Sequence, residues 1–131
     1  MDRAHRIARK QEEVTAANHG GRGTPASGSG DKTKNDVRNT DWSFEVKSTT
    51  KKTYSLALST FETAETHALR DGRRAAMVVS FDRGLGKRPK RLVVLDEDDF
   101  IELQDQLKTY KAAVKRLDDE AWELWTQIQE N

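Results

Sequence analysis

The sequence contains no cysteine, only two prolines and few aromatic residues. Without cysteine the chain can form neither disulfides nor thiolate zinc sites, so a metal ion would have to bind carboxylates, carbonyl groups or histidines. Such oxygen-rich ligand sets favour a hard cation such as Mg²⁺. The absence of cysteine therefore narrows the metal chemistry open to this chain.

Long apolar runs are also missing. No segment is apolar over the length needed to cross a bilayer, and the first residues, MDRAHRIARKQEE, lack the apolar core of a signal peptide. We therefore expect a cytoplasmic protein with no membrane partner. A chain of 131 residues is long enough to bury a hydrophobic core of its own.

The formal net charge of +1 conceals a division along the chain. Residues 1–95 contain 19 Lys and Arg against 11 Asp and Glu, whereas residues 96–131 contain 4 against 11. A basic body followed by an acidic segment favours a polyanion-binding domain that carries a helix with another role. The alternative is an ordinary solvated surface. We expect the domains to be residues 1–95 and residues 96–131.

The pattern of apolar and turn-forming residues predicts an α/β fold, in which a mixed central β-sheet is flanked by helices. Ser59 and Glu62 fit a capping box at the start of the middle helix, and Gly72 is placed to end that helix. The Gly- and Ser-rich segment 20–35 is expected to be a loop that is mobile without a ligand. We expect helices at residues 3–18, 60–71 and 96–131, and strands at 36–38, 42–49, 54–58, 75–81 and 92–95.

The last predicted helix carries an unbroken heptad pattern of apolar residues. Two interpretations remain open: the helix packs on its own domain, or it forms a coiled coil with a second subunit. Trp122 and Trp125 flank the pattern, where they either widen a packed face or anchor a partner. The apolar seam consists of Phe100, Leu103, Leu107, Tyr110, Val114, Leu117, Ala121, Leu124 and Ile128.

The strand expected at residues 42–49 alternates between apolar and polar side chains. Phe44 and Val46 point to one face, whereas Glu45 and Lys47 point to the other. A solvent-exposed polar face is the usual explanation of such a pattern. Chemistry is the alternative here, because Asp36 is expected on the neighbouring strand and a helix with two further carboxylates precedes it.

Carboxylates on adjacent strands repel each other unless a cation lies between them. Asp36 and Glu45 would thus bind Mg²⁺, and the carbonyl oxygen of Val46 would add a third ligand. A water molecule bound to such a metal becomes acidic enough to attack a phosphodiester. Lys47 would orient that water and neutralise charge that develops on the phosphate.

These residues resemble the motif of the PD-(D/E)XK nuclease superfamily. Asp36 followed by Glu45-Val46-Lys47, after the helix RKQEEVTAANHGG and the loop TPASGSG, is similar to the small Holliday junction resolvases of archaea and phages. The resemblance covers about residues 6–95. Asn35 stands where the motif has proline.

The resemblance implies a restriction-endonuclease-like fold, Mg²⁺-dependent cleavage of four-way DNA junctions, with Mn²⁺ as a substitute, and a homodimer that cuts paired strands. It implies that Asp36, Glu45 and Lys47 are catalytic together with Glu12, or with Glu13 if the register differs by one residue. A phage enzyme of this kind would act in the host cytoplasm. Ser27 or Ser29 matches a serine that contacts the DNA backbone. The expected DNA-contacting residues are Arg22, Ser27, Ser29, Lys32, Lys34, Lys51 and Lys52.

Other motifs carry less. The segment GTPASGSGDKT lacks the uninterrupted Gly-Lys-Thr of a nucleotide-binding P-loop, so we exclude nucleotide hydrolysis. His5, His19 and His67 lack metal-ligand spacing and are expected at the surface. The basic loop 82–91 is expected either to contact phosphates or to be solvated.

Two other functions remain open. One is a non-catalytic DNA-binding or architectural protein, which would gain nothing from carboxylates facing phosphates. The other is a nuclease that acts on nicked, branched or plain duplex DNA.

Overall fold

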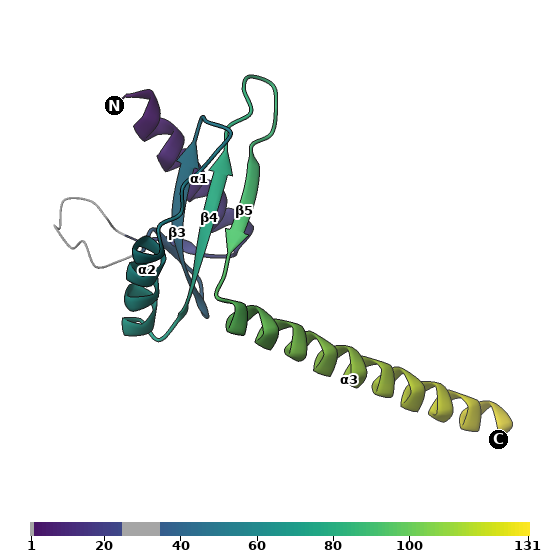
Figure 1. The fold of residues 1–131 in the computed structure, drawn as a ribbon. Helices are drawn as coiled ribbons and strands as arrows, with labels where there is room; N and C mark the ends of the chain where they lie inside the picture. Colours follow the sequence, from purple (N-terminus) through teal and green to yellow (C-terminus); the bar gives the residue numbers. More distant parts are fainter. Residues whose placement is uncertain (1, 25–34) are drawn as a thin grey trace. The chain divides into compact units, whose positions relative to one another are not determined.

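The computed structural model describes residues 2–24 and 35–131. It divides into two compact units, Met1–Asp96 and Glu97–Asn131. The first is an α/β unit with a five-stranded mixed sheet, and the second is a single long helix (Figure 1). None of the helices in the described part of the chain is both long and apolar enough to cross a membrane.

The strands of the first unit lie in the order β1-β2-β3-β4-β5. Only β3 and β4 are parallel, and the helix α2 connects them; the other neighbouring pairs are antiparallel. The strands are β1 (Arg22–Gly23), β2 (Val37–Arg38), β3 (Trp42–Thr49), β4 (Arg74–Phe81) and β5 (Lys90–Val94). The helices are α1 (Arg3–Asn18), α2 (Leu58–Arg70) and α3 (Glu97–Glu130).

Helix α1 packs against one face of the sheet (Figure 1). The core on this side contains Val37, Phe44, Ala76 and Val78, with Ala16 of α1 packed against them. The helix begins at Asp2, whose side chain accepts a hydrogen bond from the backbone N–H of His5 at 2.9 Å.

Two glycines follow α1. Gly20 has a φ of +60°, a conformation that favours glycine and turns the chain. A Cβ at Gly21 would lie 2.7 Å from the carbonyl oxygen of Arg38, so only glycine lets the chain pass this close to β2.

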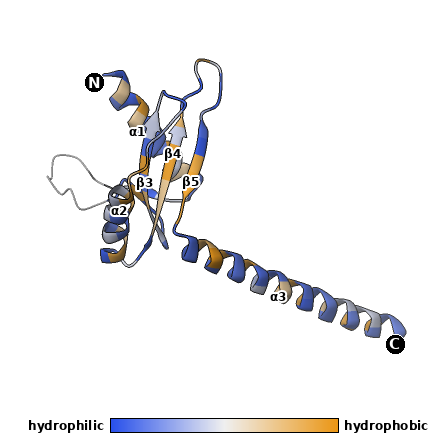
Figure 2. Ribbon diagram, viewed as in Figure 1, coloured by the Kyte–Doolittle hydropathy of each residue, from blue (hydrophilic) through white to orange (hydrophobic). Residues whose placement is uncertain are grey.

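Helix α2 covers the opposite face of the central strands through its buried residues Phe61, Ala64 and Ala68. Strand β4 is buried on both faces because alternate residues point toward α1 and α2. Figure 2 shows the apolar colouring of the central strands against the mixed surface of the helices.

The elements predicted at residues 3–18, 42–49, 75–81 and 92–95 are confirmed within one or two residues. The strand predicted at 54–58 is wrong, because those residues lead into α2 instead. The capping box is also wrong: the helix begins one residue before Ser59, and its N-cap Ala57 makes no side-chain hydrogen bond. Segment 20–35 is not wholly a loop, since β1 lies in it.

Candidate functional site

The site begins with Asp36 and Glu45 on neighbouring chain segments. The antiparallel register pairs Val37 with Phe44, so the next position outward places Asp36 opposite Glu45. Residues opposite each other in such a pair point to the same face. Asp36 Oδ2 also accepts a hydrogen bond from the backbone N–H of Val46 at 2.8 Å, which holds the carboxylate against β3.

Lys47 lies two residues beyond Glu45 on the same face of β3. Its Nζ is 3.1 Å from Glu45 Oε1, and the two side chains are 37% and 21% exposed. The lysine is therefore an ion-pair partner of the site and remains accessible. The usual explanation of the polar face, full exposure to solvent, is wrong: Ser43 is buried on it beneath α2, and Glu45 and Lys47 are only partly exposed.

A third carboxylate comes from α1. When Glu12 is protonated, its side chain donates a hydrogen bond to Asp36, and Glu12 also lies close enough to Glu45 to interact electrostatically. Glu13, the next residue, is exposed. The structure therefore places Glu12, and not Glu13, beside Asp36.

All three carboxyl groups have a raised pKa. Burial is the main cause for each, and the charge of Asp36 raises the pKa of Glu12 and of Glu45 further. Burial lowers the pKa of Lys47, but the charge and the hydrogen bond of Glu45, together with smaller contributions that include the charge of Asp36, outweigh it, so the pKa of Lys47 is raised. Three acids and one lysine leave this part of the protein short of positive charge at neutral pH.

Three of these four residues line a cavity of about 350 Å³ between β3 and α2; Glu12 does not. Asp36, Glu45 and Lys47 form one wall, and the helix contributes the other. The residues of α2 that line it are Thr60, Thr63, Ala64 and His67. Sequence reasoning missed the polar ones among them, although their spacing of three and four residues places them on one side of a helix.

Asn35 anchors the chain next to Asp36. It is buried, and its Nδ2 donates hydrogen bonds to Ser43 Oγ at 2.9 Å and to the carbonyl oxygen of Ala64 at 3.0 Å. Its Oδ1 lies 3.3 Å from His67 Nδ1. Asn35 thus links the chain before β2 to β3 and α2.

Two histidines predicted at the surface are partly buried. His67 lines the cavity, and His19 stacks on Phe44 with 4.5 Å between ring centroids. His5 is exposed, as predicted.

The site was tested for its fit to a divalent cation. In the described ranges 2–24 and 35–131, no three His, Asp or Glu side chains are already spaced as a ligand set. The donor chemistry fits nonetheless: the carboxyl groups of Glu12, Asp36 and Glu45 interact with one another, and Glu45 is paired with Lys47. A cation bound between them would relieve the repulsion between the carboxylates.

We expect Mg²⁺ to stabilise the protein. Because the pKa of these acids is raised, the folded protein binds their protons more tightly than the unfolded chain does, so their contribution to stability falls as the pH rises above their ordinary values of 3.8 and 4.5. Mg²⁺ at about 100 times its dissociation constant should add about 2.7 kcal/mol at pH 7.5. Thermal unfolding at pH 7.5 and pH 5 measures this, and the gain should be smaller at pH 5.

The matched control is Asp36→Asn, which should show little gain with Mg²⁺. Without the cation this variant should be more stable than the parent at pH 7.5, because it removes one of the repelling charges. An equal Mg²⁺ shift in both proteins would contradict binding at this site.

A basic surface lies near the end of β3. Lys51 and Lys52 line a cavity of about 750 Å³ together with Arg83 and Lys87 from the loop between β4 and β5. Arg3 of α1 also contributes. Three segments far apart in the sequence thus form one cationic surface, here called the β3-end basic surface (Arg3, Lys51, Lys52, Arg83 and Lys87).

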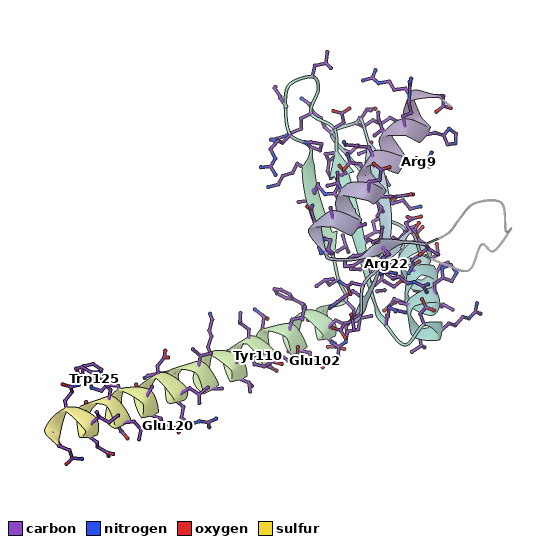
Figure 3. All side chains as sticks on the ribbon, turned by 180° about the vertical axis from the view of Figure 1, so that it is seen from behind. Arg9, Arg22, Glu102, Tyr110, Glu120 and Trp125 are labelled. Carbon is purple, nitrogen blue, oxygen red and sulfur yellow. The ribbon has the colours of Figure 1, made fainter. Side chains whose placement is uncertain are left out.

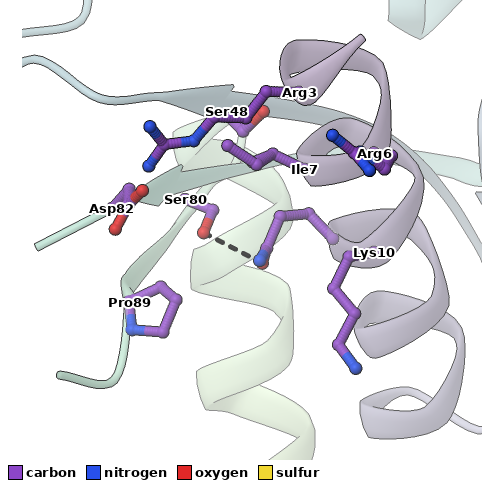
Figure 4. Close-up of a pocket in the computed structure, with 9 residues that line it drawn as sticks. Arg3, Arg6, Ile7, Lys10, Ser48, Ser80, Asp82 and Pro89 are labelled. Atoms are coloured by element: carbon purple, nitrogen blue, oxygen red, sulfur yellow. Dashed lines mark hydrogen bonds between the residues drawn. The ribbon is translucent and has the colours of Figure 1, made fainter. Parts of the chain in front are cut away.

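A second cavity of about 460 Å³ adjoins this surface through Arg3. Figure 4 shows Arg6 and Lys10 of α1 on one side, with Ser48 of β3, Ser80 of β4 and Asp82 just after β4 on the other. Within its lining, Ser80 Oγ donates a hydrogen bond of 2.9 Å to Gln11 Oε1.

Arg91 does not extend toward a phosphate ligand. The basic-loop hypothesis is wrong for this residue, because its guanidinium donates hydrogen bonds to Gln11 Oε1 and Thr15 Oγ1 of α1. Burial lowers its pKa. Arg91 therefore links β5 to helix α1.

The other predicted DNA contacts are distributed unevenly. Arg22 is exposed on β1, and its position is labelled in Figure 3. Ser27, Ser29, Lys32 and Lys34 lie outside the described residues, as does most of the loop predicted to be mobile.

Comparison of the chain with known protein families, with characterised proteins and with solved structures finds no match in any of the three. The functional interpretation therefore depends on the chemistry of the site.

Proposed function

We propose that this protein is a Mg²⁺-dependent DNA endonuclease with a restriction-endonuclease-like fold of the PD-(D/E)XK type. One observation carries the proposal: Asp36, Glu45 and Lys47 line an open cavity, and Glu12 interacts with both of these carboxylates. At neutral pH, repulsion within such a cluster of carboxylates destabilises the fold unless a ligand such as a cation binds them.

Each residue has a distinct part in the proposed reaction. Asp36 and Glu45 would hold the cation, with the Val46 carbonyl as an additional ligand, and Glu12 would complete the set of carboxylates. When bound, the cation would supply an acidified water and a Lewis acid for the phosphodiester. Lys47, whose raised pKa keeps it protonated, stabilises the negative charge that increases on the phosphate.

DNA is proposed as the substrate because of the β3-end basic surface. This surface contains five cationic side chains, which suits contacts to a phosphate backbone. We propose a four-way junction as the preferred substrate. The competing function, DNA binding without cleavage, is disfavoured because three carboxylates next to the bound phosphates would weaken binding.

A single cleavage assay tests the function. The full-length protein is incubated with a labelled four-way junction and with a linear duplex of the same sequence, with Mg²⁺ or with EDTA. Cleavage with Mg²⁺ alone supports the nuclease, and faster cleavage of the junction supports the substrate. Binding without cleavage of either DNA would contradict the nuclease and favour the competing function.

We expect Lys51→Ala with Lys52→Ala to weaken DNA binding and to reduce its dependence on salt. The slope of log K against log salt is negative, and each lost phosphate contact reduces its magnitude by about 0.9. The magnitude should therefore fall by about 2 in the double variant. Titration of a labelled duplex at several salt concentrations measures the slope. Lys108→Ala with Lys115→Ala on α3 is the matched control and should leave it unchanged.

A further inference from the structure

Helix α3 is a unit by itself and cannot cover its own apolar seam. Seven of its nine seam side chains are half or more exposed, from Phe100 at 50% to Ile128 at 69%. Figure 2 shows apolar residues recurring along the helix, and in Figure 3 Tyr110 and Trp125 project from it. A solitary helix gains most of its stability from packing of such a face, so the seam requires a partner.

The charges of α3 indicate which partner fits. All four basic residues lie within residues 108–116, a stretch with no acid, whereas residues 118–123 contain four acids and no base. Two parallel copies in register would place base against base and acid against acid. Two antiparallel copies that cross at the midpoint between Lys115 and Arg116 would place most of the basic stretch of each along the acidic stretch of the other.

The sizes of the seam residues indicate the same arrangement. In the antiparallel pair that crosses between Lys115 and Arg116, Val114 faces Leu117 of the second copy, Leu107 faces Leu124, and Leu103 faces Ile128. Tyr110, the large polar aromatic residue of the seam, then faces Ala121, the smallest seam residue. A parallel pair would place Tyr110 against Tyr110 and leave a gap between two alanines, whereas well-packed layers combine large with small side chains.

The flanking positions add a specific ion pair. Lys111 and Asp118 directly follow the seam residues Tyr110 and Leu117, so they lie at the edge of the seam. In the antiparallel register, Lys111 of each copy lies near Asp118 of the other, and this pair forms twice. In a parallel pair, the neighbours of these residues would be Gln106 and Ala113, which are uncharged.

From these observations, we propose that α3 forms an antiparallel coiled coil with α3 of a second copy of this chain. The pairing is independent of the nuclease function. Because each helix begins at Glu97, the two starting points would lie at opposite ends of the coiled coil, roughly 50 Å apart. The coiled coil therefore tethers two α/β units, and paired cutting of one junction would require a second contact between these units.

Disulfide trapping tests the orientation, since the chain has no cysteine of its own. Leu107→Cys and Leu124→Cys are purified separately, and one of them carries a size tag. Each protein is treated with oxidised glutathione by itself, and the two are also treated together after mixing and subunit exchange. The antiparallel pair should give a crosslinked heterodimer in the mixture and little crosslinked dimer in either protein alone. Leu107→Cys mixed with Leu117→Cys is the matched control and should crosslink poorly, because these positions share no layer.

Crosslinked homodimers of each single variant would show a parallel pair and overturn the proposal. A protein that sediments as a monomer and gives no crosslink would also overturn it, since the seam would then pack on its own chain or remain uncovered.

Charge reversal provides a measurement that avoids the core. Lys111→Asp should weaken dimerisation several-fold in sedimentation, and adding Asp118→Lys should restore it. If Lys111→Asp has no effect, or if the double variant is as weak as the single one, the antiparallel register is wrong.

Discussion

Asp36→Asn is expected to reduce Mg²⁺-dependent DNA cleavage about a thousand-fold while the protein still folds and binds DNA. The metal contributes several kcal/mol to such a reaction, and each 1.36 kcal/mol corresponds to a factor of ten. Asparagine retains an oxygen that can accept the hydrogen bond from Val46, so the local backbone should not change. The β3-end basic surface is untouched, so phosphate contacts should persist.

Single-turnover cleavage and a gel shift in EDTA measure the two halves of this prediction. The control is Asp41→Asn, which removes an exposed carboxylate from the turn between β2 and β3 and should cleave at the parent rate. Cleavage by Asp36→Asn within a few-fold of the parent rate would remove Asp36 from the metal site. If Asp36→Asn also loses DNA binding, the substitution would be shown to act through the fold or the DNA-binding surface, and not through the metal site.

Replacing Leu107 and Leu117 together with lysine is expected to convert a dimer into monomers. Each lysine would place an unpaired charge between two apolar side chains of the coiled coil, which costs about 3–5 kcal/mol where the group is well buried. Since 1.4 kcal/mol is a factor of ten, the dissociation constant should rise at least a hundred-fold. Sedimentation equilibrium measures the change.

Ala112→Lys is the control for the added charge, because Ala112 is exposed and lies on the side of α3 opposite the seam. It should leave the dimer intact. A folded double variant that remains dimeric would show that another surface joins the subunits, and that the seam packs within one chain.

Most elements of the fold could be predicted because their signals are local. The alternation in β3, the continuous apolar run of β4 and the heptads of α3 each reflect the repeat of one element, which does not depend on its neighbours. The start of α2 could not be predicted in this way. Ser59 and Glu62 match a capping box, but the chain enters the helix one residue earlier, at Leu58, without any side-chain cap.

The candidate site could be predicted in part for the same reason. The spacing of Glu45 and Lys47 places both on one face of a strand, and the short connection from β2 makes Asp36 a neighbour of Glu45. His67 lies 31 residues after Asp36 in the sequence. No local pattern indicates that the two residues line the same cavity. That contact arises because α2 folds back over β3, where Asn35 and Ser43 meet Ala64.

The sequence by itself determined the identity of most elements, the separation of charge between residues 1–95 and 96–131, and the apolar seam of α3. Only the tertiary structure decided that Glu12 and not Glu13 meets Asp36, and that burial raises the pKa of all three acids. It also decided that Arg91 bonds to α1 while Lys51 and Lys52 join Arg83 and Lys87. The physical reason is that side-chain periodicity is a property of one segment, whereas burial and electrostatic coupling depend on which distant segments pack together.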